Sequence, residues 1–144
     1  GLIYGEREYS PRCIIELSTL TGACVVALGE ELSGVFTSDD ALAEGVLTAA
    51  DASTDVAWRM PMYEPYKTKH DSPVADFRNA QSDRWGGSIT AALFLQEFVE
   101  KTPYAHVDIA GPAYDETERA YMAPGATGYG VNLLMAYLRG LTSS

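Results

Sequence analysis

Short apolar runs alternate with amphipathic segments along this chain, a pattern typical of strands alternating with helices. Residues 13–17 and 104–109 are apolar enough to form strands buried on both faces. Residues 35–37 and 56–60 predict two further strands. We therefore expect an α/β fold in which one sheet carries helices on both faces.

Helices are predicted between these strands. Residues 2–9 are expected to form the end of a helix that Pro11 breaks, and the helix after Gly22 is expected to stop at Gly29. Ser38 is expected to cap the next helix. The apolar face of that helix consists of Leu42, Val46, Ala49 and Ala50.

Two later segments also have helical patterns. Residues 88–101 are apolar nearly all round, which predicts a helix buried on more than one side. Residues 129–141 predict the last helix. Its apolar positions, spaced i, i+3, i+4 and i+7, are Val131, Leu134, Met135 and Leu138. We expect these four side chains to form its buried face.

Two connections are long. Residues 62–88 are irregular by composition, with a short extended piece expected near residues 74–77. Residues 114–124 are polar and predict a loop. Since long connections in a compact domain usually bind ligands or form interfaces, we expect residues 62–88 to have one of these roles.

Composition narrows the class of protein. The chain has 144 residues, 47% of them hydrophobic, which predicts one globular unit. Its net charge of -10 repels nucleic-acid phosphates and anionic lipids, so we expect neither nucleic acid nor membrane as a partner. Cys13 and Cys24 lie in apolar runs and are interpreted as reduced core thiols of an intracellular protein. The abrupt apolar start at Gly1, without Met, suggests a piece of a longer chain.

Two turns follow strands and are rich in small residues. In open α/β sheets, ligands collect beyond the carboxyl ends of the strands. The first turn, residues 19–22, precedes a helix, and the second turn, residues 110–113, follows the last strand. The Gly22 amide and the Leu20 carbonyl could face a ligand, or Thr19 and Thr21 could merely cap the helix.

Other candidate chemistry has plainer explanations. His106 is interpreted as a core histidine that Asp108, on the same side of the strand, could pair with. Asp51 and Asp55 are interpreted as a solvated helix end. The segment GATGYG, residues 125–130, reverses the glycine spacing of a dinucleotide loop, so a glycine-rich entry to a helix is favoured over phosphate binding.

The blocks TLTGACVVALG, WRMP, SPVADFRN, GGSITAALFLQEF, HVDIAG and GATGYGVNLL occur in an order that resembles the leucyl aminopeptidase (cytosol aminopeptidase) family of di-metal exopeptidases. The resemblance extends roughly from residue 1 to residue 140. It implies that residues 1–144 are the C-terminal portion of one catalytic domain, with a mixed sheet. The N-terminal domain and the metal-ligand motif Asn-Thr-Asp-Ala-Glu-Gly-Arg are absent from this sequence.

The resemblance also implies a function and a set of site residues. The whole protein would be a cytoplasmic homo-hexamer that uses two divalent ions, Zn or Mn, to release N-terminal leucine and similar apolar residues from peptides. No catalytic residue or metal ligand falls in this chain, which alone is expected to be inactive. The implied substrate-binding residues are Thr19, Leu20, Gly22, Val25, Ala110 and Ala113.

Some positions depart from the pattern of the family. Pro112, Tyr114 and a polar insertion at residues 115–123 alter the expected rim of the pocket.

The alternatives to the enzyme are a non-catalytic structural or assembly module on the same scaffold and a nucleotide-binding α/β domain. Intact carboxylates in the upstream motif would favour the enzyme over the first, and binding of nucleotide would favour the second.

Overall fold

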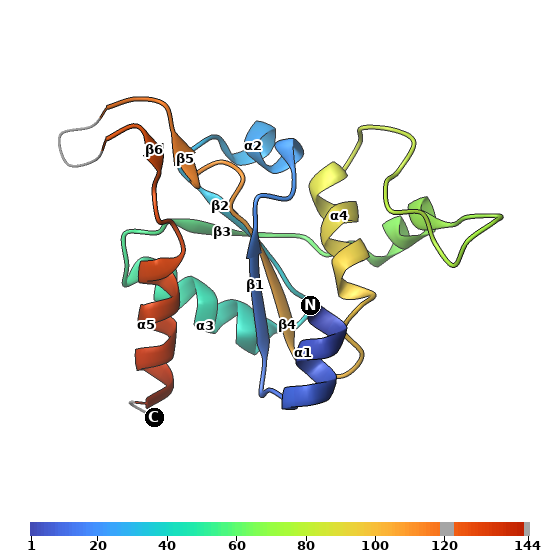
Figure 1. Cartoon of the computed structure of the whole chain (residues 1–144), viewed down its shortest axis with the longest axis horizontal. Helices are drawn as coiled ribbons and strands as arrows, with labels where there is room; N and C mark the ends of the chain where they lie inside the picture. The colour runs from blue at the N-terminus through green and yellow to red at the C-terminus, as the bar shows by residue number, and fades with distance from the viewer. Residues whose placement is uncertain (119–122, 143–144) are drawn as a thin grey trace.

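A computed structural model describes residues 1–118 and 123–142 of the chain (Figure 1). None of the helices in these two ranges is long and apolar enough to cross a membrane. In chain order, the elements are α1 (Leu2–Tyr9), β1 (Ile14–Ser18), α2 (Gly22–Leu28), β2 (Ser33–Phe36), α3 (Asp40–Asp51), β3 (Ala57–Met60), the 3₁₀ helix η1 (Glu64–His70), α4 (Gly87–Gln96), β4 (Tyr104–Asp108), β5 (Tyr114–Asp115), β6 (Gly125–Ala126) and α5 (Val131–Thr142).

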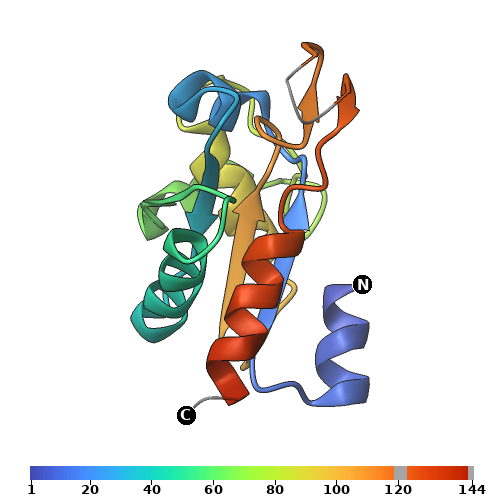
Figure 2. The ribbon, with the colours of Figure 1, turned by 90° about the vertical axis from the view of Figure 1, so that its left-hand side faces the viewer.

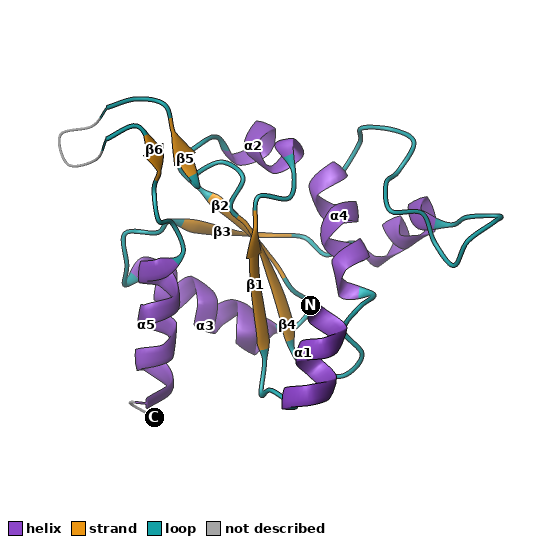
Figure 3. Ribbon diagram, in the orientation of Figure 1, coloured by secondary structure: helices purple, strands orange, loops and turns teal. Residues whose placement is uncertain are grey.

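The central sheet is mixed, as expected. Its strand order is β1-β4-β2-β3 (Figure 3). β1 pairs with β4 in parallel, β4 pairs with β2 antiparallel, and β2 pairs with β3 in parallel. The carboxyl ends of β1 and β4 therefore lie at the same edge as the starts of β2 and β3. A separate two-stranded hairpin, β5 with β6, stands beyond that edge (Figure 1).

Helices cover both faces of the sheet, and this confirms the predicted fold class. α3 and α5 lie side by side on one face, over a core that includes Val35, Val107 and Leu133 (Figure 2). α2 and α4 lie on the other face, where Phe36 and Cys24 are buried. Alternate residues of each strand point to opposite faces, so one short sheet supports two cores.

The predicted apolar face of α3 is confirmed, but its predicted cap is wrong. Leu42, Val46, Ala49 and Ala50 are all buried. The helix is capped by Asp39, whose carboxylate accepts the Leu42 N–H at 2.8 Å, and not by Ser38. Both residue types are good caps, and the backbone turns into the helix one residue later than predicted.

Of the four positions predicted for the buried face of α5, Leu134 packs against the core, but the other three do not. Val131, Met135 and Leu138 are 61%, 45% and 55% exposed, whereas Leu133 is fully buried. Tyr137 packs with Leu133 against the core and lies beside Gly45 of α3. Apolar residues surround more than half of this helix, so periodicity alone does not select the face that meets the sheet.

The long connection contains η1, and no strand is found near residues 74–77 in the described part of the chain. Residues 73–76 form bends instead. The His70 carbonyl accepts the Arg78 N–H at 2.8 Å, and the Phe77 ring packs edge-on against Phe94 and Phe98 of the α4 region. These contacts curl the segment back toward α4, which itself ends at Gln96, earlier than predicted.

A carboxylate of helix α1 binds the chain that follows α4. Glu6 accepts the backbone N–H groups of Glu100, Lys101 and Thr102 at 2.8–2.9 Å. The first of these hydrogen bonds, followed by the other two, lowers the pKa of Glu6 to about 2 from an ordinary value of 4.5. The carboxylate thus satisfies three amides that follow the end of α4.

Candidate functional site

The first and second turns leave the sheet next to each other. Ser18, the last residue of β1, is paired with Asp108, the last residue of β4. The Ile109 N–H donates to the Ser18 carbonyl at 2.9 Å, which continues the pairing beyond the strands. The parallel register therefore brings together two turns that are almost ninety residues apart in the sequence.

One buried carboxylate joins the two turns. Asp108 is fully buried, and its Oδ1 accepts the Leu20 N–H at 3.2 Å and the Ala110 N–H at 3.1 Å. Its Oδ2 accepts the Thr21 hydroxyl at 2.7 Å. Thr21 Oγ1 in turn accepts the Cys24 N–H at 3.0 Å and caps α2, so the capping role predicted for Thr21 is confirmed.

Asp108 does not pair with His106, contrary to the prediction. The His106 ring is bound through Nδ1 to Glu16 Oε2 at 2.6 Å, across the β1–β4 pair. Residues i and i+2 of one strand are about 6.6 Å apart, whereas residues in register on adjacent strands are about 4.8 Å apart. Burial raises the pKa of Glu16, but hydrogen bonds from His106 and Ser18 outweigh it and lower that pKa overall.

Cys24 lies beneath the first turn and is not poised as a nucleophile. The residue is 1% exposed. Burial, together with the negative charge of Asp108, raises the pKa of the Cys24 thiol to about 11. The thiol therefore stays protonated at neutral pH and acts as a packing group.

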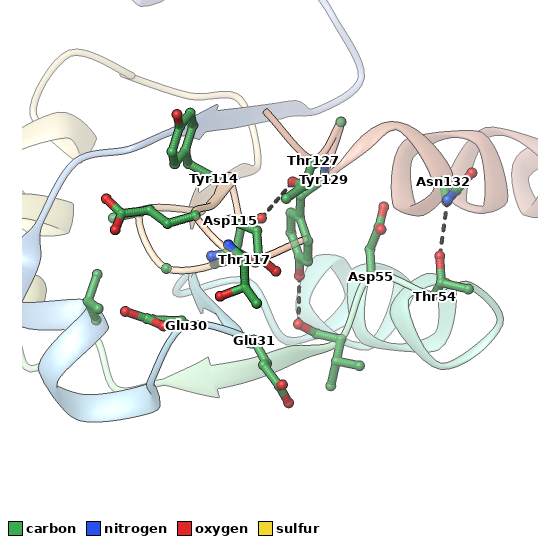
Figure 4. A pocket seen from close by; sticks show the side chains of 17 residues that line it. Glu30, Glu31, Thr54, Asp55, Tyr114, Asp115, Thr117, Thr127, Tyr129 and Asn132 are labelled. Atoms are coloured by element: carbon green, nitrogen blue, oxygen red, sulfur yellow. Dashed lines mark hydrogen bonds between the residues drawn. The ribbon is translucent and has the colours of Figure 1, made fainter. Parts of the chain in front are cut away.

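A cavity of about 980 Å³ opens beyond this edge of the sheet (Figure 4). Its walls come from the α2–β2 and α3–β3 connections, the second turn, the β5–β6 hairpin and the start of α5. Tyr129 closes one side, since its hydroxyl donates to the Val56 carbonyl at 2.6 Å (Figure 4). The lining residues are Val25, Glu30, Glu31, Thr54, Asp55, Val56, Ala110, Gly111, Pro112, Tyr114, Asp115, Glu116, Thr117, Thr127, Gly128, Tyr129 and Asn132.

The cavity is strongly acidic. The carboxylates of its lining belong to Glu30, Glu31, Asp55, Asp115 and Glu116, and no Lys, Arg or His is among the described residues that form its walls. Such a cavity attracts cations and repels phosphates.

The predicted substrate residues fall into two groups. Val25 and Ala110 line the cavity. Thr19, Leu20 and Gly22 are exposed at the first turn, outside that lining, and are tied to the second turn through Asp108. 

Ala113 also lies outside the lining, at the end of the second turn. Its N–H donates to the Ile109 carbonyl at 3.0 Å, and its carbonyl accepts the Thr127 N–H at 3.1 Å. The second turn is thereby closed on itself and attached to the chain that leads into α5. The structure thus brings the two turns to one edge but separates their residues between a cavity and an open surface.

Asp55 is a structural anion rather than part of a solvated helix end, so that prediction is wrong for this residue. It is 6% exposed, and its Oδ2 accepts the N–H groups of Gly130 at 3.0 Å and Leu133 at 2.9 Å. The carboxylate occupies the N-terminus of α5, the place where a phosphate would sit. This arrangement agrees with the favoured interpretation of residues 125–130 as a glycine-rich entry to a helix. The amides that would bind a nucleotide phosphate there already bind Asp55.

Asp108 and Asp55 were both missed as organising residues. Asp108 is the last residue of an apolar strand, and Asp55 lies two residues before another strand. That signal is visible in the sequence, but it does not indicate which amides the carboxylate will bind.

The described residues offer no fit for a metal ion. In the ranges 1–118 and 123–142, no group of three or more His, Cys, Asp and Glu side chains is arranged to hold one. We therefore assign no metal-dependent step to side chains of this segment.

Open α/β sheets commonly bind ligands where turns meet at one edge beside a cavity, and the first and second turns of this chain have that arrangement. The family model for the cytosol aminopeptidase family, catalytic domain, matches residues 1–135. This chain belongs to the cytosol aminopeptidase family.

Individual relatives agree with that assignment. A probable cytosol aminopeptidase from Cyanothece sp. is 53% identical over 140 residues, which cover 97% of this chain and 28% of the relative. One from Synechococcus sp. is 54% identical over 138 residues, 96% of this chain and 27% of the relative. The structure of a mutant of tomato leucine aminopeptidase is similar with a TM-score of 0.88 and 43% identity, covering 95% of this chain and 26% of that one. The chain thus spans about a quarter of the length of these relatives.

Proposed function

We propose that this chain is the substrate-binding part of a metal-dependent aminopeptidase that releases N-terminal amino acids, preferably leucine and similar apolar residues, from peptides. The observation that carries the proposal is the meeting of the first and second turns, tied by Asp108, beside a large acidic cavity. Family membership supplies the class of reaction.

Each part of this arrangement suits a peptide N-terminus. The acidic walls favour the free ammonium group, and the small side chains of the second turn leave room for an apolar side chain. The exposed first turn offers backbone groups to the peptide backbone, with the Leu20 carbonyl and the Gly22 amide as the expected partners. Two divalent ions, Zn or Mn, would be held by residues outside this segment, in a cytoplasmic homo-hexamer.

The test is hydrolysis of leucine amide by the whole enzyme with added manganese. We expect release of leucine that a chelator abolishes and that fresh metal restores. A protein that stays folded and inactive with every divalent metal tried would favour the non-catalytic assembly module instead. A thermal shift with nucleotide, and none with a peptide-like inhibitor plus metal, would favour a nucleotide-binding domain.

A further inference from the structure

We propose, on the basis of the function proposed above, that Asp108 is a positioning residue that sets the relative placement of the two substrate-binding turns. Its side chain is not itself part of the cavity lining and is fully buried from solvent. It acts through the backbone of the first turn and of the second turn.

The contacts of Asp108 reach the second and third residues of the first turn and the first residue of the second turn. The Leu20 N–H, 3.2 Å away, and the Ala110 N–H, 3.1 Å away, share the same carboxylate oxygen, Oδ1. The other oxygen accepts the Thr21 hydroxyl at 2.7 Å. A shift of either turn would therefore weaken hydrogen bonds on a single acceptor, which couples the positions of the two turns.

A carboxylate is the side chain of this size with enough acceptor capacity for the task. Ionised Asp has about four lone-pair sites and no donor, whereas Asn replaces one oxygen by a donating NH₂ group. Among the ion pairs of the described residues, none involves Asp108. The hydrogen-bond donors that offset the cost of burying the Asp108 carboxylate therefore come from the two turns.

The same contacts aim one expected substrate-binding group. The Thr21 N–H points to Asp108 Oδ1 at 3.5 Å. In a trans peptide the N–H and the preceding C=O point in opposite directions, so the Leu20 carbonyl is directed away from the buried carboxylate. Asp108 therefore orients the carbonyl that the proposed function assigns to the peptide backbone.

Substitutions in the whole enzyme test the role. Asp108→Ala removes every acceptor, and Asp108→Asn keeps one oxygen for the amides. We expect the KM for leucine amide to rise about tenfold or more in Asp108→Ala and less in Asp108→Asn, because misplaced binding groups weaken substrate alignment. The kcat should change less than KM, since the proposed metal ligands lie elsewhere.

Thr21 supplies a second, milder pair of variants. Thr21→Val removes the hydroxyl that binds Asp108 and caps α2, and should raise KM, whereas Thr21→Ser keeps the hydroxyl and should restore the wild-type value. Val107→Ala is the control for stability alone, because Val107 is buried on the opposite face of β4. It should lower the melting temperature and leave KM unchanged.

Three results would overturn the proposal: a wild-type KM in folded Asp108→Ala and Thr21→Val enzymes, a loss confined to kcat, or an equal rise of KM in Val107→Ala.

Failure of the proposed function would look different, as a wild-type enzyme that releases no leucine. In that case, amide hydrogen exchange still tests whether Asp108 holds the two turns. The Leu20 and Ala110 amides should exchange about tenfold faster in folded Asp108→Asn, because a neutral acceptor binds them less tightly than a carboxylate. Wild-type exchange rates would refute the role of Asp108.

Discussion

Among the described residues, three carboxylates accept backbone N–H groups from distant segments. Asp108 joins the two turns, Asp55 binds the start of α5, and Glu6 binds the chain after α4. Hydrogen bonds from N–H groups to a charged oxygen are shorter and stronger than those between neutral groups. Each carboxylate therefore fixes a junction that apolar packing alone would leave less precisely defined.

The Glu6 junction predicts a pH-dependent stability. Because its pKa is lowered from 4.5 to about 2 in the folded chain, its contribution is fully present above pH 4.5 and is lost as the pH falls through about 2. Glu6→Gln should lower the urea midpoint at neutral pH, and the difference from wild type should shrink in acid. Glu8→Gln, on the exposed side of α1, is the matched control. An unchanged gap between wild type and Glu6→Gln across this pH range would contradict the prediction.

Gly22→Val tests the first turn directly. A Cβ at Gly22 would meet nothing within 4 Å, so the substitution should leave the fold intact and fill only space outside it. In the whole enzyme we expect leucine amide hydrolysis to fall at least about tenfold with metal content unchanged. Ala27→Val, an exposed position in the same helix, should retain activity. Near-normal turnover by Gly22→Val would remove the first turn from the substrate path.

The start of α5 shows how an element is placed by a few backbone contacts. Gly130 has a φ of +95°, and a Cβ there would come within 2.3 Å of the Leu17 side chain, so glycine meets both requirements. Its N–H and that of Leu133 bind Asp55. The helix is thereby attached both to β1 and to the connection before β3, and its buried face follows from that attachment.

Asp55→Ala should therefore release the first turn of α5. Loss of hydrogen bonds to a buried charged acceptor costs about 1.5–3 kcal/mol, and we expect a destabilisation of that size in urea unfolding. Asp51→Ala is the control, since Asp51 is exposed and should change stability by no more than about 0.5 kcal/mol. Equal effects of the two substitutions would show that Asp55 does not hold α5.

The contact of the second turn with the end of α2 gives another test. A Cβ at Gly111 would lie 2.4 Å from the Gly29 carbonyl oxygen, which is backbone and cannot swing away. Gly111→Ala should destabilise the chain by about 1–3 kcal/mol, as overpacking does. Gly5→Ala, where a Cβ meets open space, should be neutral or slightly stabilising. The melting temperatures of both variants are compared by calorimetry. An unchanged melting temperature in Gly111→Ala would mean that the Gly29 backbone moves easily to make room.

Over the whole molecule, one side of the sheet presents apolar side chains to solvent. β1 is an edge strand, and α1 and α5 flank it (Figure 2). Ile3 and Tyr4 of α1 are 43% and 62% exposed, and four large apolar residues of α5 are 45–61% exposed. An open sheet edge between exposed apolar helices favours association.

The 144-residue chain alone is therefore expected to self-associate. Light scattering with size exclusion should show oligomers or aggregates at micromolar concentration, and Leu138→Lys should reduce them by placing a charge in the exposed α5 surface. Thr48→Lys, at an exposed position of α3, changes the net charge by the same amount and is the control. A monodisperse, stably folded monomer would contradict the expectation.

Local pattern predicted most of the elements because strands and helices depend on neighbouring residues. The β1, α2, α3 and β4 segments were predicted within a residue or two of their observed bounds. The errors occur where several local choices were equally good. Ser38 and Asp39 are both suitable caps, and α5 has apolar residues on several sides, so tertiary contacts made the selection.

By itself, the sequence determined the alternation of strands and helices, the acidic character and the two small-residue turns after strands. These properties depend on composition and on residues within one or two turns of each other. Only the tertiary structure decided that Glu16 rather than Asp108 binds His106, that Asp108 joins the two turns, and that Asp55 fills the start of α5. Those partners are 75 to 90 residues apart. Strand register and helix docking bring them within hydrogen-bond distance, and no local pattern encodes either.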